Sequence, residues 1–133
     1  MGMIGILVTT HGELCNGLLH AAHMIAGEQE GVDAVSLDEN GIDDFASRLE
    51  TKLDEMVEKY NQVLVMCDLK GGTPCNQSLR YGFINEGKIK VVAGVNLPML
   101  IETIFGRSSV ESLEELAIFA SDAGKQSIEY ITL

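Results

Sequence analysis

A short apolar run near the start of the chain ends in a histidine and a glycine: Met3-Ile4-Gly5-Ile6-Leu7-Val8-Thr9-Thr10-His11-Gly12. A second apolar run ends in an aspartate and a glycine-rich turn: Val63-Leu64-Val65-Met66-Cys67-Asp68-Leu69-Lys70-Gly71-Gly72-Thr73-Pro74. Each run is followed by an amphipathic helical pattern, which is typical of buried parallel strands that lead into helices. The two stretches therefore predict an α/β fold in which His11 and Asp68 stand at strand ends.

The rest of the chain alternates in the same way. We expect strands at residues 3–9, 31–37, 62–67, 88–95 and 127–132, and helices at residues 13–26, 43–60, 73–83, 98–105 and 110–123. Thr73 is expected to be the N-cap of its helix, with Pro74 at the first helical position. The alternation indicates a mostly parallel sheet with helices on both faces. Right-handed crossovers favour a flavodoxin-like strand order 2-1-3-4, with the last strand at an edge.

In this strand order, the strands that end at His11 and Asp68 are neighbours, and the winding reverses between them. Ligands of open parallel sheets bind at such a switch point, beyond the carboxyl ends of the strands. A neutral imidazole attacks phosphorus well when a carboxylate holds one ring nitrogen and leaves the other free. We therefore predict that His11 is a nucleophile and that Asp68 orients it. The alternative is a hydrogen-bonded loop histidine, with Asp68 capping a turn.

The same edge of the sheet would supply hydrogen-bond donors to a phosphoryl group. The helices that follow the two strands present free backbone N–H groups and positive dipole ends. Gly12, Gly71 and Gly72 would let the backbone come close, and the hydroxyls of Thr10 and Thr73 would add hydrogen bonds. The scheme requires no metal and no cofactor.

Composition excludes several classes of protein. The net charge of −11 argues against nucleic acid as a partner, because phosphate binding needs a basic surface. No apolar run approaches the ~20 residues of a membrane span, and no basic segment precedes an apolar stretch at the N-terminus, so a cytoplasmic protein is expected. The 133 residues are enough for one domain, 1–133, with a core.

Other reactive side chains have simpler explanations. His20 and His23 are three residues apart and could share a metal, but no third ligand is evident and a solvated helix face is favoured. Cys15 and Cys75 lie in first turns of helices, where thiol pKa values fall, so a Cys–His–Asp hydrolase is an alternative function. Without a secretory signal, reduced thiols are expected. Met24 and Met99 are placed at the flanks of the crevice, as adaptable contact residues.

Three stretches of the chain resemble motifs that one family carries in the same order. The first is Thr10-His11-Gly12, followed by Gly17-Leu18-Leu19, Ala21-Ala22, Met24-Ile25 and Gly27-Glu28-Gln29; the second is Asp68-Leu69-Lys70-Gly71-Gly72-Thr73-Pro74-Cys75-Asn76; the third is Ala93-Gly94-Val95-Asn96-Leu97-Pro98-Met99-Leu100-Ile101-Glu102. Together they resemble the mannose-family enzyme IIA components of the bacterial phosphoenolpyruvate-dependent sugar phosphotransferase system. Lys70 departs from the aromatic or small residue expected before Gly71.

The resemblance implies a cytoplasmic phosphocarrier with the flavodoxin-like fold. His11 would accept a phosphoryl group from the histidine-containing phosphocarrier protein and pass it to enzyme IIB, with Asp68 orienting the imidazole. Met24, Asn96 and Met99 would contact these partners, and association with a membrane permease would be indirect.

The resemblance also implies a homodimer in which the last strand, 127–132, is exchanged and pairs antiparallel on the partner's sheet. Two related functions remain as alternatives. One is the phosphocarrier subunit of a dihydroxyacetone kinase system, where Ser-His-Ser would be expected in place of Thr10-His11-Gly12. The other is a regulatory domain of a transcription activator that phosphorylation switches.

Overall fold

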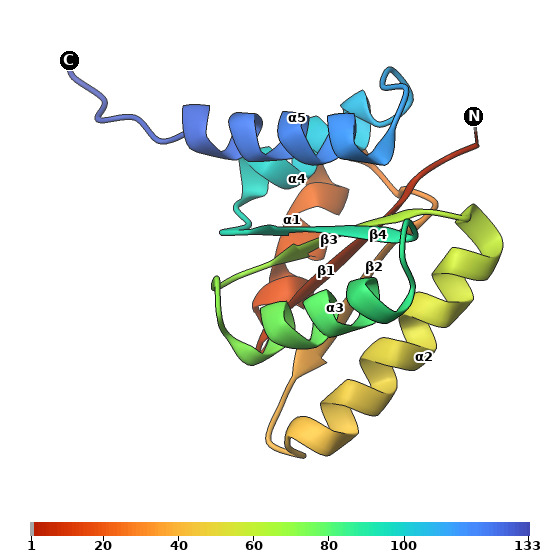
Figure 1. The fold of residues 1–133 in the computed structure, drawn as a ribbon. Coiled ribbons are helices and arrows are strands. Elements are labelled where there is room, and N and C mark those ends of the chain that lie inside the picture. The colour runs from red at the N-terminus through yellow and green to blue at the C-terminus, as the bar shows by residue number, and fades with distance from the viewer. Residues whose placement is uncertain (1) are drawn as a thin grey trace.

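The computed structural model describes residues 2–133. Its centre is a sheet of four parallel strands in the order β2-β1-β3-β4 (Figure 1). The strands are β1 (Gly5–His11), β2 (Val32–Leu37), β3 (Val63–Cys67) and β4 (Ile89–Ala93). The predicted α/β class and the strand order 2-1-3-4 are confirmed. No helix within residues 2–133 is both long and apolar enough to cross a membrane.

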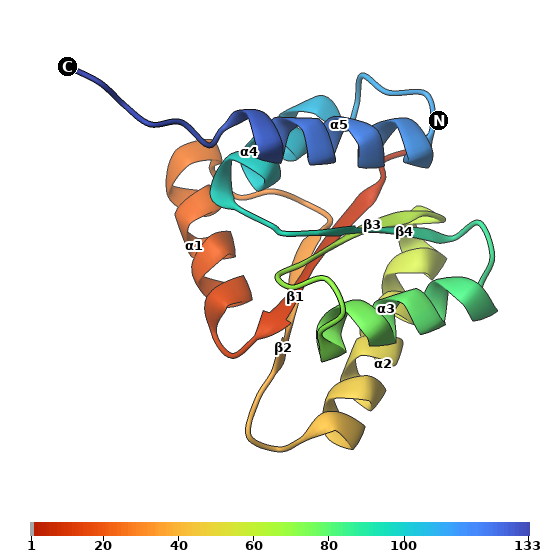
Figure 2. The same ribbon diagram turned by 60° about the vertical axis from the view of Figure 1, so that its left-hand side comes forward.

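The helices cover both faces of the sheet. They are α1 (Leu14–Ala26), α2 (Ile42–Tyr60), α3 (Thr73–Ile84), α4 (Leu97–Gly106) and α5 (Leu113–Gln126). Helices α1, α4 and α5 lie on one side, and α2 and α3 lie on the other (Figures 1 and 2). The helices pack against the sheet through apolar stripes. In α2, the buried residues recur every three or four positions and form one inward stripe: Phe45, Leu49, Leu53 and Met56.

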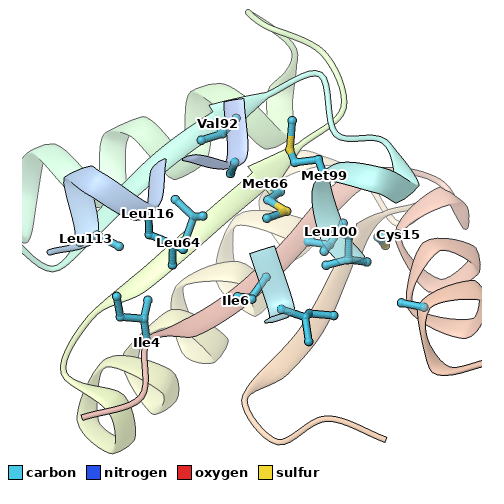
Figure 3. Packing of buried hydrophobic residues seen from close by; sticks show 14 residues of the cluster. Ile4, Ile6, Cys15, Leu64, Met66, Val92, Met99, Leu100, Leu113 and Leu116 are labelled. Carbon is cyan, nitrogen blue, oxygen red and sulfur yellow. The ribbon is translucent and has the colours of Figure 1, made fainter. Parts of the chain in front are cut away.

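Each face of the sheet has its own hydrophobic core, because successive strand residues point to opposite sides. Ile6 and Val8 of β1 belong to the cluster beneath α1, α4 and α5, which Figure 3 shows from close by. Leu7, between them, packs with Phe45 and Tyr81 on the side of α2 and α3. All of β1 before His11 is buried, so the strand is held in place along its length.

Two predictions about element ends are wrong. Helix α3 begins with Thr73 itself, and Gly72 occupies the N-cap position without any side-chain hydrogen bond. Thr73 is therefore not the cap, and Pro74 lies one position later in the helix than expected. The rigid φ of proline suits either of these positions, so the residue pattern did not distinguish them.

The predicted strand at residues 127–132 does not form. Helix α5 continues to Gln126, and the chain then runs away from the body of the molecule without regular structure (Figures 1 and 2). Ile128 is 81% exposed and Tyr130 is 90% exposed. The period-two alternation of this segment is typical of a strand. A strand also needs a neighbouring strand to pair with, and this segment does not turn back to its own sheet. Exchange between two chains stays a prediction.

Candidate functional site

His11 and Asp68 meet at the carboxyl edge of the sheet. Thr9 of β1 pairs with Cys67 of β3. The residues that follow Thr9 and Cys67 therefore leave the sheet next to each other. The Nδ1 atom of His11 lies 2.9 Å from Oδ2 of Asp68, and the backbone N–H of His11 donates to the same oxygen at 3.0 Å. The predicted pairing of these two residues is thus present, although 57 positions separate them.

The carboxylate of Asp68 is held in its charged form. Burial of the group raises its pKa, but the hydrogen bonds from the His11 backbone and imidazole and from the Leu69 backbone outweigh this, and the pKa lies below its ordinary value. Oδ1 accepts from the Leu69 N–H at 2.9 Å. An ionised carboxylate only accepts, so Nδ1 of His11 carries a proton, and Nε2 is the nitrogen with a free lone pair.

The imidazole faces outward from this support. The side chain of His11 is 46% exposed, whereas that of Asp68 is 11% exposed. The imidazole is therefore accessible while the carboxylate that it contacts is sheltered from water, which strengthens the interaction between them. A group that is exchanged between proteins needs this combination of access and fixed orientation.

Gly72 supplies the space for the imidazole. A Cβ at this position would lie 2.9 Å from Cε1 of His11, closer than carbon atoms approach without displacement. The residue has φ of −76°, which any residue can adopt. Glycine is thus required here by the contact with His11 and not by the backbone conformation. Gly71, in contrast, has φ of +83° and shapes the turn before α3.

The hydrogen-bond donors predicted for a phosphoryl group are only partly available. The N–H of Gly12 donates to the Leu37 carbonyl at 2.7 Å, and that of Gly72 donates to the Leu69 carbonyl at 3.1 Å, so neither is free. The amides of Thr73 and Cys75 lie in the first turn of α3, where the helix offers no acceptor. These amides, with the positive end of the α3 dipole, are the better candidates for phosphate contacts.

Thr10 has a different role from the predicted one. Its side chain is fully buried, and its hydroxyl oxygen accepts from the N–H of Cys15 at 2.8 Å. Thr10 therefore positions the first turn of α1 from inside and does not contact a group at the surface. The prediction that its hydroxyl binds phosphate is wrong, because the strand directs that side chain inward.

The three residues predicted to contact partners lie in different environments. Met24 is 78% exposed and is free to meet another protein, but Met99 is 3% exposed and packs into the core beneath Gly124. Met99 as a partner contact is thus contradicted. Asn96 caps α4 by accepting from the Met99 N–H at 2.9 Å, and its amide donates to the Gly124 carbonyl at 3.1 Å. The polar atoms of Asn96 are occupied in holding α4 against α5, and any contact with a partner stays a prediction.

The thiols are poorly placed for nucleophilic catalysis. Cys15, Cys67 and Cys75 are all free and buried. Burial raises the pKa of the Cys67 thiol to about 12, and the neighbouring Cys75 and Asp68 add to this. His20 and His23 lie on the exposed face of α1, and residues 2–133 contain no group of three or more side chains suited to hold a metal ion. Neither the hydrolase nor a histidine metal site gains support.

Sequence reasoning did not single out two exposed leucines that lie near the site in the chain. Leu14, the first residue of α1, is 50% exposed, and Leu69, directly after Asp68, is 60% exposed. Leu14 follows His11 by three residues, and this closeness in sequence to His11 and Asp68 is the signal that would have identified the two leucines. Exposed apolar side chains beside a reactive group suit contact with a protein partner.

Replacing Gly72 with alanine should impair the chemistry of His11 without unfolding the protein. The added methyl group would push the imidazole away from its bond with Asp68, at a cost of about 1 kcal/mol or more, and the reaction of His11 should slow by about tenfold. Gly17→Ala is a matched control, because a Cβ there meets nothing within 4 Å. The ¹⁵N NMR shifts of His11 would report the displaced ring. A Gly72→Ala protein with wild-type shifts and wild-type reactivity would contradict the proposed contact.

Comparison with known proteins agrees with the fold and with the family that the motifs resemble. The family EIIA-man, described as PTS system fructose IIA component, matches residues 5–120. The chain is 33% identical over 136 residues to the PTS system mannose-specific EIIAB component of Escherichia coli strain K12, an alignment that covers 95% of this chain and 39% of that protein. The chain thus spans about two-fifths of the length of that relative.

Solved structures of the same kind superpose closely. The mannose/sorbose specific IIA subunit of the phosphotransferase system from Enterococcus faecalis is 33% identical, with a TM-score of 0.86 over 98% of this chain and 96% of that chain. The phosphotransferase system component EIIA from Streptococcus agalactiae is 30% identical, with a TM-score of 0.86 over 96% of this chain and 97% of that chain. The chain belongs to the mannose-family EIIA components of the phosphotransferase system, as its three motifs predicted.

Proposed function

We propose that this chain carries a phosphoryl group on Nε2 of His11, accepting it from the histidine-containing phosphocarrier protein and passing it to enzyme IIB. The observation that carries the proposal is the double contact of one Asp68 oxygen, at 3.0 Å from the His11 N–H and 2.9 Å from its Nδ1. This contact fixes both the backbone and the ring of His11. The membership of the chain in the EIIA family supports the same role.

In the proposed reaction, the lone pair of Nε2 attacks the phosphorus of the donor's phosphohistidine, and the donor's P–N bond breaks. The proton on Nδ1 stays in its hydrogen bond to Asp68, whose negative charge balances the positive charge that develops on the ring. The donor leaves as a neutral imidazole after its own ring takes back the electron pair. The reverse sequence, with enzyme IIB as acceptor, removes the phosphoryl group.

Incubation of the chain with phosphoenolpyruvate, enzyme I and the phosphocarrier protein tests this function. One acid-labile, base-stable phosphoryl group per chain is expected, and addition of enzyme IIB should remove it. We place this reaction in the cytoplasm, where the membrane permease is reached only through enzyme IIB. Failure to take up phosphate from the complete donor system would overturn the proposal.

Other functions lack a specific observation in their favour. The residues around the histidine, Thr10-His11-Gly12, differ from the Ser-His-Ser expected for the dihydroxyacetone kinase phosphocarrier. The thiols that a hydrolase would need are buried. A regulatory role as part of a longer protein would use the same phosphorylated histidine, and transfer to enzyme IIB distinguishes it from a carrier.

We further propose that the chain forms a homodimer through its C-terminal segment, residues 127–132, which pairs on the sheet of a second copy. The segment carries exposed apolar side chains, Ile128, Tyr130 and Ile131 among them, and β4 forms an edge of the sheet. An unpaired strand edge next to an exposed alternating segment favours pairing between chains.

Removal of residues 128–133 should convert the dimer to a monomer in analytical ultracentrifugation. Ser127 should be kept, because its hydroxyl contacts the Gly124 carbonyl at 2.7 Å and the Asn96 amide at 3.3 Å. The shortened chain should still be phosphorylated, which shows that it is folded. A full-length chain that sediments as a monomer at micromolar concentration would rule out this dimer.

A further inference from the structure

Residues 69–72 form a tight turn against the imidazole of His11. The N–H of Gly72 donates to the Leu69 carbonyl at 3.1 Å, and Gly71 has φ of +83°, which together define a type II turn. Lys70 occupies the first central position of this turn. Because a Cβ at Gly72 would lie 2.9 Å from Cε1 of His11, the backbone of Lys70 is held two residues from a position directly beside the imidazole.

Lys70 is a basic residue among acidic ones at the carboxyl edge of the sheet. Residues 12–17, 38–41, 68–76 and 94–96 follow the four strands at the carboxyl edge of the sheet. Their carboxylates are Glu13, Asp38, Glu39 and Asp68, and Lys70 is their one lysine or arginine. Its side chain is exposed, and no ion pair found within residues 2–133 involves it.

Arg48 of α2 also approaches this edge, but its charge is already engaged. Arg48 of α2 donates to Asp44 at 2.8 Å and to the Ser36 carbonyl at 2.8 Å, and it lies 3.7 Å from Asp38. Two carboxylates thus neutralise Arg48. Lys70 has a flexible four-carbon stem, and the ion pairs found within residues 2–133 leave its charge unneutralised.

A phosphoryl group on His11 would bring a charge of about −2 next to the carboxylate of Asp68. The first-turn amides of α3 offset only part of this charge, because a helix N-terminus is equivalent to about half a positive charge. Positively charged side chains are the usual means by which proteins stabilise phosphoryl groups. We propose that the ammonium group of Lys70 stabilises the phosphorylated form of His11, an inference that rests on the proposed phosphorylation of this histidine.

The equilibrium of phosphoryl exchange distinguishes this role from docking. A contact that exists only in the complex between two proteins changes the rate of transfer, but it cannot change the equilibrium constant between the free phosphorylated and unphosphorylated species. A cation that stabilises phosphohistidine in the isolated chain does change that constant. The ratio of phosphorylated chain to phosphorylated donor, measured after equilibration, therefore reports Lys70's own effect.

The experiment compares Lys70→Met, which keeps the stem and loses the charge, with Lys70→Arg and with Lys90→Met. Lys90 is an exposed lysine of β4 and serves as the matched control. At low salt, Lys70→Met should shift the equilibrium toward the phosphorylated donor about two- to fivefold, the range for an exposed charge pair. The shift should shrink at high salt, and Lys70→Arg should restore the wild-type value.

The outcomes separate the two proposals. If the wild-type chain takes up no phosphate on His11, the proposed function fails before Lys70 is tested. If the wild type is phosphorylated but Lys70→Met shows the wild-type equilibrium constant, the role of Lys70 is overturned. A change confined to the KM for the donor protein would likewise overturn it and identify Lys70 as a docking residue.

Discussion

A His11→Ala variant should take up no phosphoryl group from the complete donor system, whereas the wild-type chain is expected to take up one. Among the three histidines of the sequence, His11 is the one whose ring is oriented by a carboxylate. His20 and His23 lie on the exposed face of α1. The variant should lose transfer to enzyme IIB as completely as it loses phosphorylation, because the proposed transfer passes through His11.

The loss should not come from unfolding. The His11 side chain is 46% exposed, and in its absence the Asp68 carboxylate keeps two hydrogen bonds, from the backbone N–H groups of residues 11 and 69. Such a surface truncation typically changes the free energy of unfolding by less than about 1 kcal/mol. Circular dichroism and thermal unfolding check this point.

Two controls make the assignment specific. His20→Gln and His23→Gln should be phosphorylated at the wild-type rate. In the wild type, NMR of the phosphorylated chain should place the phosphoryl group on Nε2, because Asp68 holds Nδ1 at 2.9 Å. Label that persists in His11→Ala, or a phosphoryl group on Nδ1 of the wild type, would contradict the geometry of the site.

The pattern of the sequence was sufficient to predict how His11 and Asp68 come together. Both residues follow apolar runs that are fully buried in β1 and β3, and buried parallel strands leave few ways to order the sheet. Strand order then determines which strand ends are neighbours. The pairing therefore depended on hydrophobic periodicity over whole elements, which is the most dependable information that a sequence contains.

The roles of Thr10 and Met99 could not be predicted in this way, because they depend on the direction of one side chain. Thr10 is enclosed because β1 is covered on both faces up to this residue, and its hydroxyl then accepts from the Cys15 N–H at 2.8 Å. Met99 enters the core because α5 approaches α4 closely at Gly124, where a Cβ would lie 2.8 Å from the Met99 methyl carbon. Gly124 within a helical pattern was the available indication of this close approach.

The tail at residues 127–133 shows a different limit of sequence reasoning. The alternation of apolar and polar residues can be read from the segment alone, whereas a strand forms only by hydrogen bonding to a neighbouring strand. In the proposed dimer the second neighbour belongs to another copy of the chain, so the fold of a single copy does not show the pairing. The same holds for Met24, whose 78% exposure permits a partner contact without specifying one.

Replacing Asp68 with asparagine should slow phosphoryl transfer by roughly 10²- to 10⁴-fold, as for other orienting carboxylates. All three hydrogen bonds of Asp68 are accepted ones: two at Oδ2, from the N–H and the ring of His11, and one at Oδ1, from Leu69. An asparagine has one accepting oxygen and an amide that donates. It therefore cannot satisfy both sides of the site.

Each orientation of the asparagine has a cost. With the oxygen toward His11, the ring keeps its tautomer, but the amide faces the donating N–H of Leu69, and the positive charge on the reacting imidazole loses its counter-charge. With the amide toward His11, Nδ1 must become the acceptor, and the proton moves to Nε2, where it blocks the attacking lone pair. Removal of a negative charge also lessens repulsion of the phosphoryl group, which acts in the opposite direction.

We expect orientation to outweigh repulsion, because an unheld imidazole must be ordered at every encounter with the donor. Glu13→Gln separates the two effects, since it removes a nearby negative charge at the start of α1 without touching His11, and its rate should stay near that of the wild type. Rapid-quench measurements of transfer to both variants, with circular dichroism to confirm folding, compare them directly. A folded Asp68→Asn chain that transfers at the wild-type rate would reduce Asp68 to a residue that caps the turn before α3.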